Sequence, residues 1–293
     1  MKYRHEHHAG NFADVHKHVT LLALLAALRR KDKGFLYLET HAGRGAYDLS
    51  GSSGESASGI GRLESQQRSH GGGESVAEEI GHYLARVELL RRERGEPRLY
   101  PGSPLLAASE LRPVDRAVLV ESQAPEARAL ERALSGQPRS SRRPAQVAHI
   151  NVETGDGFER LRAWLPPRER RGLTFIDPPY EETRQDFERT RHAAAEALRR
   201  FATGVVAIWD PIKDERDTSA WHTALAAELD CELLAAELSL YPRDSRVALN
   251  GSGMLILNPP YQLADRMAIW LPQLHGCLDL GHGGGATVKQ LKT

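Results

Sequence analysis

The sequence has little of several features that mark whole classes of protein. Its two cysteines, Cys231 and Cys277, lie far apart and form no CxxC motif, so we expect neither a disulfide framework nor a cysteine-bound zinc ion. No apolar run approaches the length of a membrane span, and the first residues lack the apolar core of a signal peptide. We therefore expect a protein of the reducing cytoplasm without a membrane partner.

The sequence also lacks an excess of charge of either sign. Lys plus Arg and Asp plus Glu number 39 each among the 293 residues, so bulk electrostatics does not indicate a nucleic-acid partner. Local positive runs occur at 139–143, 168–171 and 189–200. Such runs are individually more typical of solvated helices and loops than of an RNA-binding surface.

What the chain does have is short apolar runs that alternate with segments of helical periodicity. The runs predict strands covered on both faces at 35–39, 117–121, 146–152, 173–176, 204–209 and 254–257. Helices are predicted at 13–31, 124–134, 186–202 and 216–229. This alternation predicts an α/β fold with a doubly wound, mostly parallel sheet.

One stretch interrupts the alternation. Residues 50–75 are rich in Gly and Ser, and a helical pattern follows at 76–94. We predict an inserted helical subdomain at 48–101 whose Gly/Ser-rich portion is a loop. Residues 1–47 and 102–293 would then form the main domain.

The most specific motif is Asp177-Pro178-Pro179-Tyr180, which follows an apolar run and matches the (D/N)PP(Y/F) loop of amino methyltransferases. An adenine N6 amine is a weak nucleophile because its lone pair is delocalised into the ring. The Asp177 carboxylate and the Pro178 carbonyl are suited to accept its two N–H groups, and Asp177 also to take the released proton. Tyr180 offers a face on which the base stacks. The alternative is a strand that ends at two prolines and has no chemistry.

A second motif of this kind, Asn258-Pro259-Pro260-Tyr261, also follows a predicted strand. The order of the strands decides between the two motifs. In an open α/β sheet the nucleotide-binding elements occupy the first strands, and the catalytic loop follows the next. Position 177 fits that order, and position 258 comes two strands later. We predict that Asp177 is catalytic and that 258–261 form a structural turn.

Other turns at predicted strand ends suit a nucleotide-like cofactor. The Gly43–Gly45 turn lets the backbone approach a ligand where a Cβ would clash. Glu121 is suited to accept hydrogen bonds from ribose hydroxyls, and Asp156, between two glycines, from an adenine amine. A helix N-terminal acid and an Asx turn are the structural alternatives. Because no GxGxxG motif is present, S-adenosylmethionine (SAM) fits better than NAD.

The N-terminal segment 3–18 is crowded with His, Glu and Asp, which suggests a metal site. The spacing is irregular, however, and direct displacement by SAM needs no metal, so we expect none. The favoured interpretation is a segment folded over the active site. Its rings would pack on the target base, while Lys17 and His18 reach the carboxylate end of SAM.

Several blocks follow one another in a fixed order along most of the chain, among them Tyr3–His5, His8–Asn11, Lys17–His18, Thr40–Gly43, Tyr100–Leu105, Asp156–Phe158, Ile176–Tyr180 and Gly251–Met254. This order closely resembles the RlmJ family of bacterial 23S rRNA adenine-N6 methyltransferases. The resemblance implies a Rossmann-like class I SAM-dependent methyltransferase with a small helical insertion, acting on one adenine of 23S rRNA.

The resemblance also implies roles for individual residues. Those that bind SAM or lie at the catalytic centre would be Lys17, His18, His41, Ser103, Glu121, Asp156, Gly157 and Asp177. Tyr3 and His5 are expected to contact the substrate. The sequence departs from the family pattern in the Gly/Ser-rich stretch 50–75 and in the glycine-rich tail 277–293.

Two other functions stay open at this point. DNA adenine methyltransferases carry the same loop, but the neutral charge and the absence of a large recognition domain argue against them. A catalytically inactive RNA-binding protein on the same fold is the other, and the intact 177–180 loop and Glu121 count against it. We expect a monomer that acts on free 23S rRNA or on an early assembly intermediate.

The motif analysis predicts that Asp177→Ala abolishes methyl transfer but leaves SAM binding largely intact, because the carboxylate acts on the amine. Turnover with radiolabelled SAM and calorimetric titration with SAM measure the two effects. Wild-type turnover in the variant would contradict the role assigned to Asp177.

Overall fold

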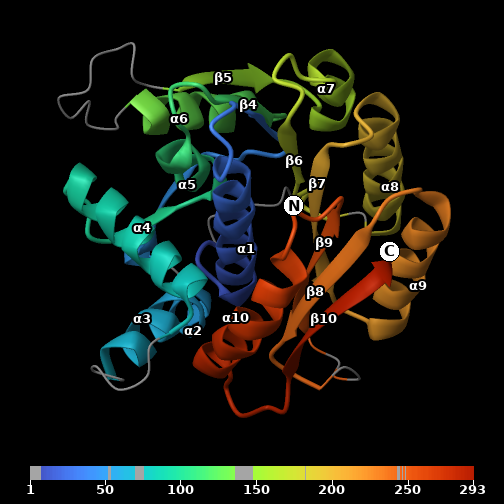
Figure 1. Cartoon of the computed structure of the whole chain (residues 1–293). Coiled ribbons are helices and arrows are strands. Elements are labelled where there is room, and N and C mark those ends of the chain that lie inside the picture. Colours follow the sequence, from blue (N-terminus) through green and yellow to red (C-terminus); the bar gives the residue numbers. More distant parts are fainter. Residues whose placement is uncertain are drawn as a thin grey trace.

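A sheet of eight strands crosses the middle of the molecule (Figure 1). The structure is a computed structural model, and it describes residues 8–51, 54–69, 76–135, 148–181, 183–242, 245, 247 and 249–293. The strand order is β10-β8-β9-β7-β6-β1-β4-β5. In chain order, the strands are β1 (Leu36–Glu39), β4 (Arg116–Glu121), β5 (His149–Thr154), β6 (Gly172–Ile176), β7 (Val205–Ile212), β8 (Leu233–Ser239), β9 (Gly251–Leu257) and β10 (Gly285–Lys292).

The strands from β5 to β7 run parallel to one another, whereas β9 is antiparallel to both β7 and β8, and β10 is antiparallel to β8. The predicted doubly wound, mostly parallel sheet is therefore confirmed. The chain extends the sheet from β1 through β4 and β5 on one side and through β6 and β7 on the other. In open α/β sheets such a reversal of strand order leaves a crevice for a ligand at the carboxyl ends of the strands.

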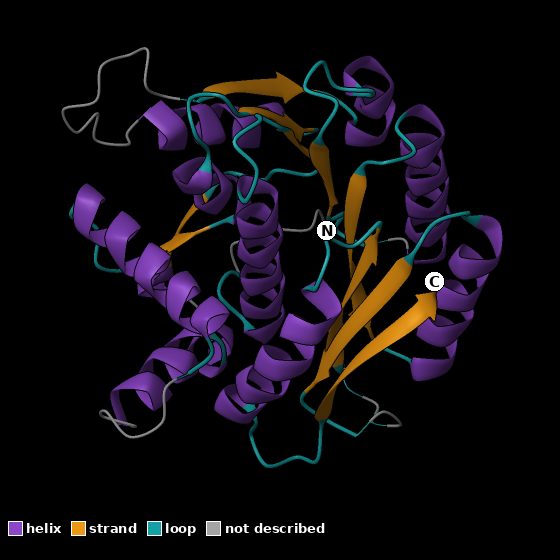
Figure 2. Cartoon of the chain, viewed as in Figure 1, coloured by secondary structure: helices purple, strands orange, loops and turns teal. Residues whose placement is uncertain are grey.

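Helices cover both faces of the sheet (Figure 2). One face packs against α1 (Phe12–Arg29), α5 (Ser103–Glu110), α6 (Ala124–Ser135) and α10 (Leu263–Leu278). The other packs against α7 (Gly157–Trp164), α8 (Thr183–Arg200) and α9 (Glu215–Glu228). Along β1, Tyr37 faces the first layer, and Leu36 and Leu38 face the second, which explains why the strand is apolar throughout. None of the described helices is long and apolar enough to cross a membrane.

The sequence patterns do not predict β8, β10 or α10. The sequence of β8, Leu-Leu-Ala-Ala-Glu-Leu-Ser, is rich in helix-forming residues, yet it is buried between β9 and β10. Its pairing with two neighbours outweighs the local propensity, which is a weak determinant of structure. The glycine-rich tail ends in β10, which pairs along the whole of β8.

The inserted stretch leaves and rejoins the main fold through two paired strands, β2 (Ala46–Asp48) and β3 (Leu99–Pro101). Between them lie α2 (Gly54–Ser58), α3 (Ile60–Ser69) and α4 (Glu78–Arg94). The prediction that the Gly/Ser-rich portion is a loop was wrong for 54–58 and 60–69, which are helical. Residues 52–53 and 70–75 lie outside the described residues.

A buried carboxylate ties the insertion to the main fold. Glu110 of α5 pairs with Arg29 of α1 and with His82 and Arg86 of α4. Three surrounding cationic or hydrogen-bonding groups outweigh the effect of burial and hold the pKa of Glu110 below its ordinary value. The insertion is thus fixed against the helix layer rather than hinged away from it.

A second contact joins the insertion to the segment that precedes α1. The Ile60 backbone N–H donates to the Gly10 carbonyl at 2.9 Å. Glu55 accepts a hydrogen bond from the Asn11 side chain and pairs with His8 at 2.8 Å. A Cβ on Gly59 would lie 2.0 Å from the Gly10 carbonyl oxygen, so only glycine permits this approach.

This close approach predicts that Gly59→Ala destabilises the protein by about 1–3 kcal/mol, because the added methyl group forces two backbone segments apart. Gly276→Ala, within α10 and with no atom within 4 Å of the new Cβ, is the matched control. It should be neutral or stabilising by up to about 1 kcal/mol. Urea unfolding of the two variants measures the difference. Equal stabilities would contradict the packing argument.

Candidate active site

A cavity of about 930 Å³ opens at the carboxyl ends of β1, β4 and β6, where the strand order reverses. His41 and Gly43 follow β1, Glu121 ends β4, and Asp177 follows β6, and all four line the cavity. The predicted residues that also line it are Lys17, His18, Ser103, Pro178 and Tyr180. Residues far apart in sequence therefore meet at one edge of the sheet.

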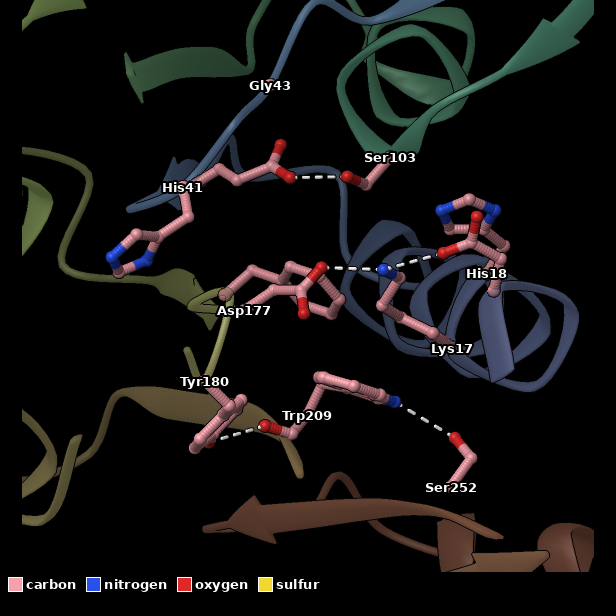
Figure 3. Close-up of polar contacts among 12 residues, drawn as sticks. Lys17, His18, His41, Gly43, Ser103, Asp177, Tyr180, Trp209 and Ser252 are labelled. Atoms are coloured by element: carbon pink, nitrogen blue, oxygen red, sulfur yellow. Dashed lines mark hydrogen bonds and ion pairs between the residues drawn. The ribbon is translucent and has the colours of Figure 1, made fainter. Parts of the chain in front are cut away.

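Lys17 of α1 reaches the aspartate of the DPPY loop (Figure 3). Its Nζ lies 2.6 Å from Asp177 Oδ2 and 2.8 Å from Asp14 Oδ1. Asn11 caps α1 by accepting from the Asp14 N–H, and Asp14 and Lys17 are three residues apart on the same face of the helix. β6 ends at Ile176 and so positions Asp177, which is followed directly by the two prolines.

The two carboxylates decide the charge of Lys17. Burial alone would lower the pKa of this side chain, but Asp14 and Asp177 outweigh that effect and raise its pKa above the ordinary value. In this structure Lys17 holds one oxygen of Asp177, and its predicted contact with the carboxylate end of SAM stays a prediction.

Tyr180 and Trp209 form the wall beneath Asp177 (Figure 3). The Tyr180 hydroxyl donates to the Trp209 carbonyl at 2.7 Å, and its ring lies 4.8 Å from that of Phe187. Tyr180 is only 2% exposed and has a positive φ of 49°. The predicted stacking face of Tyr180 is thus largely covered by protein here, whereas Trp209 is half-buried and lines the cavity.

Glu39, the last residue of β1, lies behind the cavity wall and is fully buried. Its two oxygens accept hydrogen bonds from Ser103 Oγ at 2.5 Å and from the Tyr37 hydroxyl at 2.9 Å. Burial raises the pKa of Glu39 to about 8 despite these two donors. Ser103, which begins α5, is thereby held at the cavity edge.

Glu121 fixes the glycine turn that follows β1. Its Oε2 accepts from the Gly43 N–H at 2.8 Å, and its Oε1 accepts from the Gln123 N–H at 2.8 Å. Gly43 and Gly45 have φ of 61° and 76°, a region that glycine adopts readily. The turn and the carboxylate are therefore one preorganised unit.

His41 and His18, which were both predicted to bind SAM, contact other side chains of the protein. Burial lowers the pKa of His41 to about 4, so the ring is neutral, and it lies edge-on to Phe158 at 4.8 Å. His18 is 1% exposed and hydrogen-bonds the Tyr100 hydroxyl at 2.9 Å. Tyr100 belongs to β3, so His18 also links α1 to the insertion.

Asp156 and Gly157 do not line the cavity. Asp156 caps α7 by accepting from the Phe158 and Glu159 N–H groups, and it pairs with Arg189 at 2.6 Å. A Cβ on Gly157 would lie 1.9 Å from the Thr40 carbonyl oxygen, which explains the glycine by packing alone. The predicted cofactor contacts of these two residues stay predictions. So do the predicted substrate contacts of Tyr3 and His5, which lie outside the described residues.

The second proline motif, 258–261, lies at the opposite end of the strands from the cavity. β9 is antiparallel to β7, so Asn258, which follows β9, lies away from the cavity. Its side-chain amide donates to the carbonyls of Ala202 and Gly204 at 2.8 Å each, and Tyr261 is 84% exposed. The motif forms a turn, as predicted. In the described part of the chain, no cluster of three or more His, Cys, Asp or Glu side chains is arranged to hold a metal ion.

Comparison with known proteins identifies the family. The family model described as "Ribosomal RNA large subunit methyltransferase D, RlmJ" matches residues 32–291. Two relatives are both named "Ribosomal RNA large subunit methyltransferase J". That of Haemophilus influenzae is 38% identical, covering 94% of this chain and 92% of its own. That of Escherichia coli K12 is 37% identical and covers 98% of both chains.

The chain belongs to the RlmJ family. A crystal structure of a Legionella pneumophila protein is also similar throughout, with a TM-score of 0.83, 32% identity, and coverage of 97% of this chain and 98% of that one. The resemblance inferred from the motif order is therefore confirmed, and the chain is placed among ribosomal RNA large subunit methyltransferases.

Three residues of this RlmJ-family site were not singled out from the sequence. Asp14 pairs with Lys17, Glu39 holds Ser103, and Trp209 contacts both Lys17 and Tyr180. Glu39 and Trp209 carry one detectable signal, a polar or aromatic residue at or near the carboxyl end of an apolar run. Asp14 carries none beyond its place three residues before Lys17.

The buried carboxyl of Glu39 predicts a change in the pH dependence of stability. Its pKa is about 8 in the folded protein and 4.5 ordinarily, so folding takes up a proton between these values and stability falls as pH rises through this window. Glu39→Gln stays neutral. It should gain stability relative to the wild type by up to about 1.4 kcal/mol per pH unit in that window.

Urea unfolding at several pH values between about 5 and about 8 tests this expectation. Glu88→Gln makes the same substitution at an exposed position of α4 and serves as the control. Stability curves of Glu39→Gln and the wild type that stay parallel across the window would refute it.

Proposed function

We propose that this protein transfers a methyl group from SAM to the exocyclic N6 of one adenine in 23S rRNA. The observation that carries the proposal is the position of Asp177 and Pro178. Both line the cavity at the carboxyl end of β6, next to the point where the strand order reverses. Membership of the RlmJ family supports the rRNA substrate.

The cavity suits SAM in size and in charge. Its volume of about 930 Å³ lies within the range of small-molecule sites. Its lining carries more carboxylates than Lys and Arg side chains: Asp14, Glu55, Glu121, Glu126 and Asp177 against Lys17, Arg44 and Lys213. That balance favours a sulfonium cation over a dinucleotide with two phosphates. Glu121 would accept from the ribose hydroxyls, and Ser103, His41 and the Gly43 turn would line the rest of the site.

The chain's own groups would act on the amine. Lys17 engages Oδ2 of Asp177, so the other oxygen, Oδ1, can accept an N–H of the adenine amine. The Pro178 carbonyl would accept the second N–H. Held in this way, the nitrogen directs its lone pair away from both acceptors, and such positioning contributes on the order of 7–11 kcal/mol in well-oriented reactions.

SAM supplies an electrophilic methyl group and a sulfur that leaves with the bonding electron pair as a neutral thioether. After the N–C bond forms, the amine would lose one proton, which the Asp177 carboxylate would accept. Lys17, which keeps its charge, would then stabilise the Asp177 carboxylate when that proton passes to water. The base must leave its stack to enter the cavity.

Duplex DNA is the competing substrate, because the same loop serves DNA adenine methyltransferases. The positive runs do not favour a long duplex: Arg191, Arg199 and Arg200 on α8 are paired with neighbouring glutamates. The run at 139–143 lies outside the described residues. We propose that the protein acts as a monomer in which 48–101 is an inserted subdomain.

Incubation with radiolabelled SAM and either protein-free 23S rRNA, early large-subunit assembly intermediates or duplex DNA tests the proposal. We expect label in 23S rRNA, recovered as N6-methyladenosine after digestion, and none in DNA. Asp177→Ala protein is the negative control. Label in DNA, or at another position of the nucleoside, would overturn the proposed substrate or the proposed atom.

A further inference from the structure

A buried chain of hydrogen bonds ends at the cavity wall and has no part in the function proposed above. The Trp209 indole N–H donates to Ser252 Oγ at 3.0 Å, and His16 Nδ1 lies 3.0 Å from the same oxygen. The three residues come from β7, β9 and α1. His16 and Ser252 are completely buried, and Trp209 is half-buried and lines the cavity.

The chemistry of these three side chains determines which group donates and which accepts in each hydrogen bond. An indole nitrogen only donates, so Ser252 Oγ must accept from Trp209. Burial lowers the pKa of His16 to about 3, so the ring is neutral and Nδ1 is able to accept the Ser252 proton. His16 Nε2 has no hydrogen-bond partner among the described residues, which leaves Ser252 as the group the ring serves.

The consequence is a fixed indole beside the catalytic loop (Figure 3). The Trp209 carbonyl accepts the Tyr180 hydroxyl at 2.7 Å, and the two rings are T-shaped at 5.7 Å. The Lys17 ammonium lies 5.5 Å from the centre of the indole and 2.6 Å from Asp177. The Lys17 ammonium therefore contacts both the Trp209 indole and the Asp177 carboxylate.

The accessible aromatic surface at this wall belongs to Trp209 rather than to Tyr180, which is 2% exposed. A purine needs a flat apolar surface, and stacking on an aromatic side chain is worth about 5- to 150-fold in affinity. The Lys17 ammonium lies 5.5 Å from the centre of the indole, and both side chains line the cavity, so the indole faces the cavity on the side of Lys17.

We propose that the cavity side of the Trp209 indole is the surface on which the target adenine stacks, and that Ser252 and His16 are positioning residues that hold the indole in place. The inference rests on the proposed function, because it assigns the base subsite of the same cavity. The adenine lies over the part of the indole that lines the cavity, with its amine directed to Asp177, and Lys17 keeps its ion pair with that carboxylate.

Adenosine monophosphate is the probe, titrated into the full chain and followed by calorimetry and intrinsic fluorescence. Of the four tryptophans, Trp209 is the one that lines the cavity, so we expect quenching in the wild type and none in Trp209→Leu. We expect Trp209→Leu to weaken the nucleotide by about ten-fold or more. Ser252→Ala keeps the ring and should weaken it by a smaller factor. SAM affinity should be unchanged in both.

Trp164→Leu is the matched control, because Trp164 lies on α7 and does not line the cavity. It should leave nucleotide affinity unchanged. Three results would overturn the inference: quenching that persists in Trp209→Leu, equal losses in Trp164→Leu and Trp209→Leu, or a parallel loss of SAM affinity, which would make Trp209 a packing residue only.

Steady-state methylation of protein-free 23S rRNA separates this inference from the function on which it rests. A higher KM with a smaller change in kcat in Ser252→Ala is expected from a displaced stacking surface. If the wild type binds the nucleotide through Trp209 but labels no rRNA, the proposed function fails, and the inference that a purine stacks on Trp209 is retained. If the wild type labels rRNA and Trp209→Leu keeps its KM, the stacking role fails and the function stands.

Discussion

A single buried ammonium, that of Lys17, links the parts of this molecule that meet at its cavity. Burying a charge costs several kcal/mol unless it is paired, and Lys17 is paired with Asp14 on its own helix and with Asp177 after β6. The position of α1 and that of the DPPY loop are therefore coupled. Loss of either carboxylate would leave a charge with too few partners, so α1 and the 177–180 loop stabilise each other.

Hydrogen bonds between neutral groups hold the walls on either side of that ion pair. Glu39, which also accepts from the Tyr37 hydroxyl, positions Ser103 on one side, and Ser252 and His16 position Trp209 on the other. Burial keeps Glu39 and His16 in their neutral forms, by raising one pKa and lowering the other. Glu39 and His16 therefore add no charge beside the ion pairs that Lys17 makes with Asp14 and Asp177.

The insertion is part of the same construction. Glu110 fastens α4 to α1 and α5, and the contact of Gly59 and Ile60 with Gly10 holds the chain where it enters α1. Because Lys17 lies less than two turns beyond Phe12, where α1 begins, the insertion helps to set the position of the residue that holds Asp177. The insertion, although distant from Asp177 in sequence, therefore supports the geometry of the Lys17–Asp177 ion pair.

The sequence by itself determined the parallel sheet, the family and which of the two proline motifs lies at the cavity, because apolar periodicity, motif order and strand order are local or sequential properties. It also indicated Gly43 and Glu121, since each ends or follows a recognisable strand. Only the tertiary structure decided that β8 is a strand, that Tyr180 is covered, and that Glu39, Asp14 and Trp209 belong to the site. Those features arise from pairing and burial between segments distant in the chain, and no local pattern records which segments will meet.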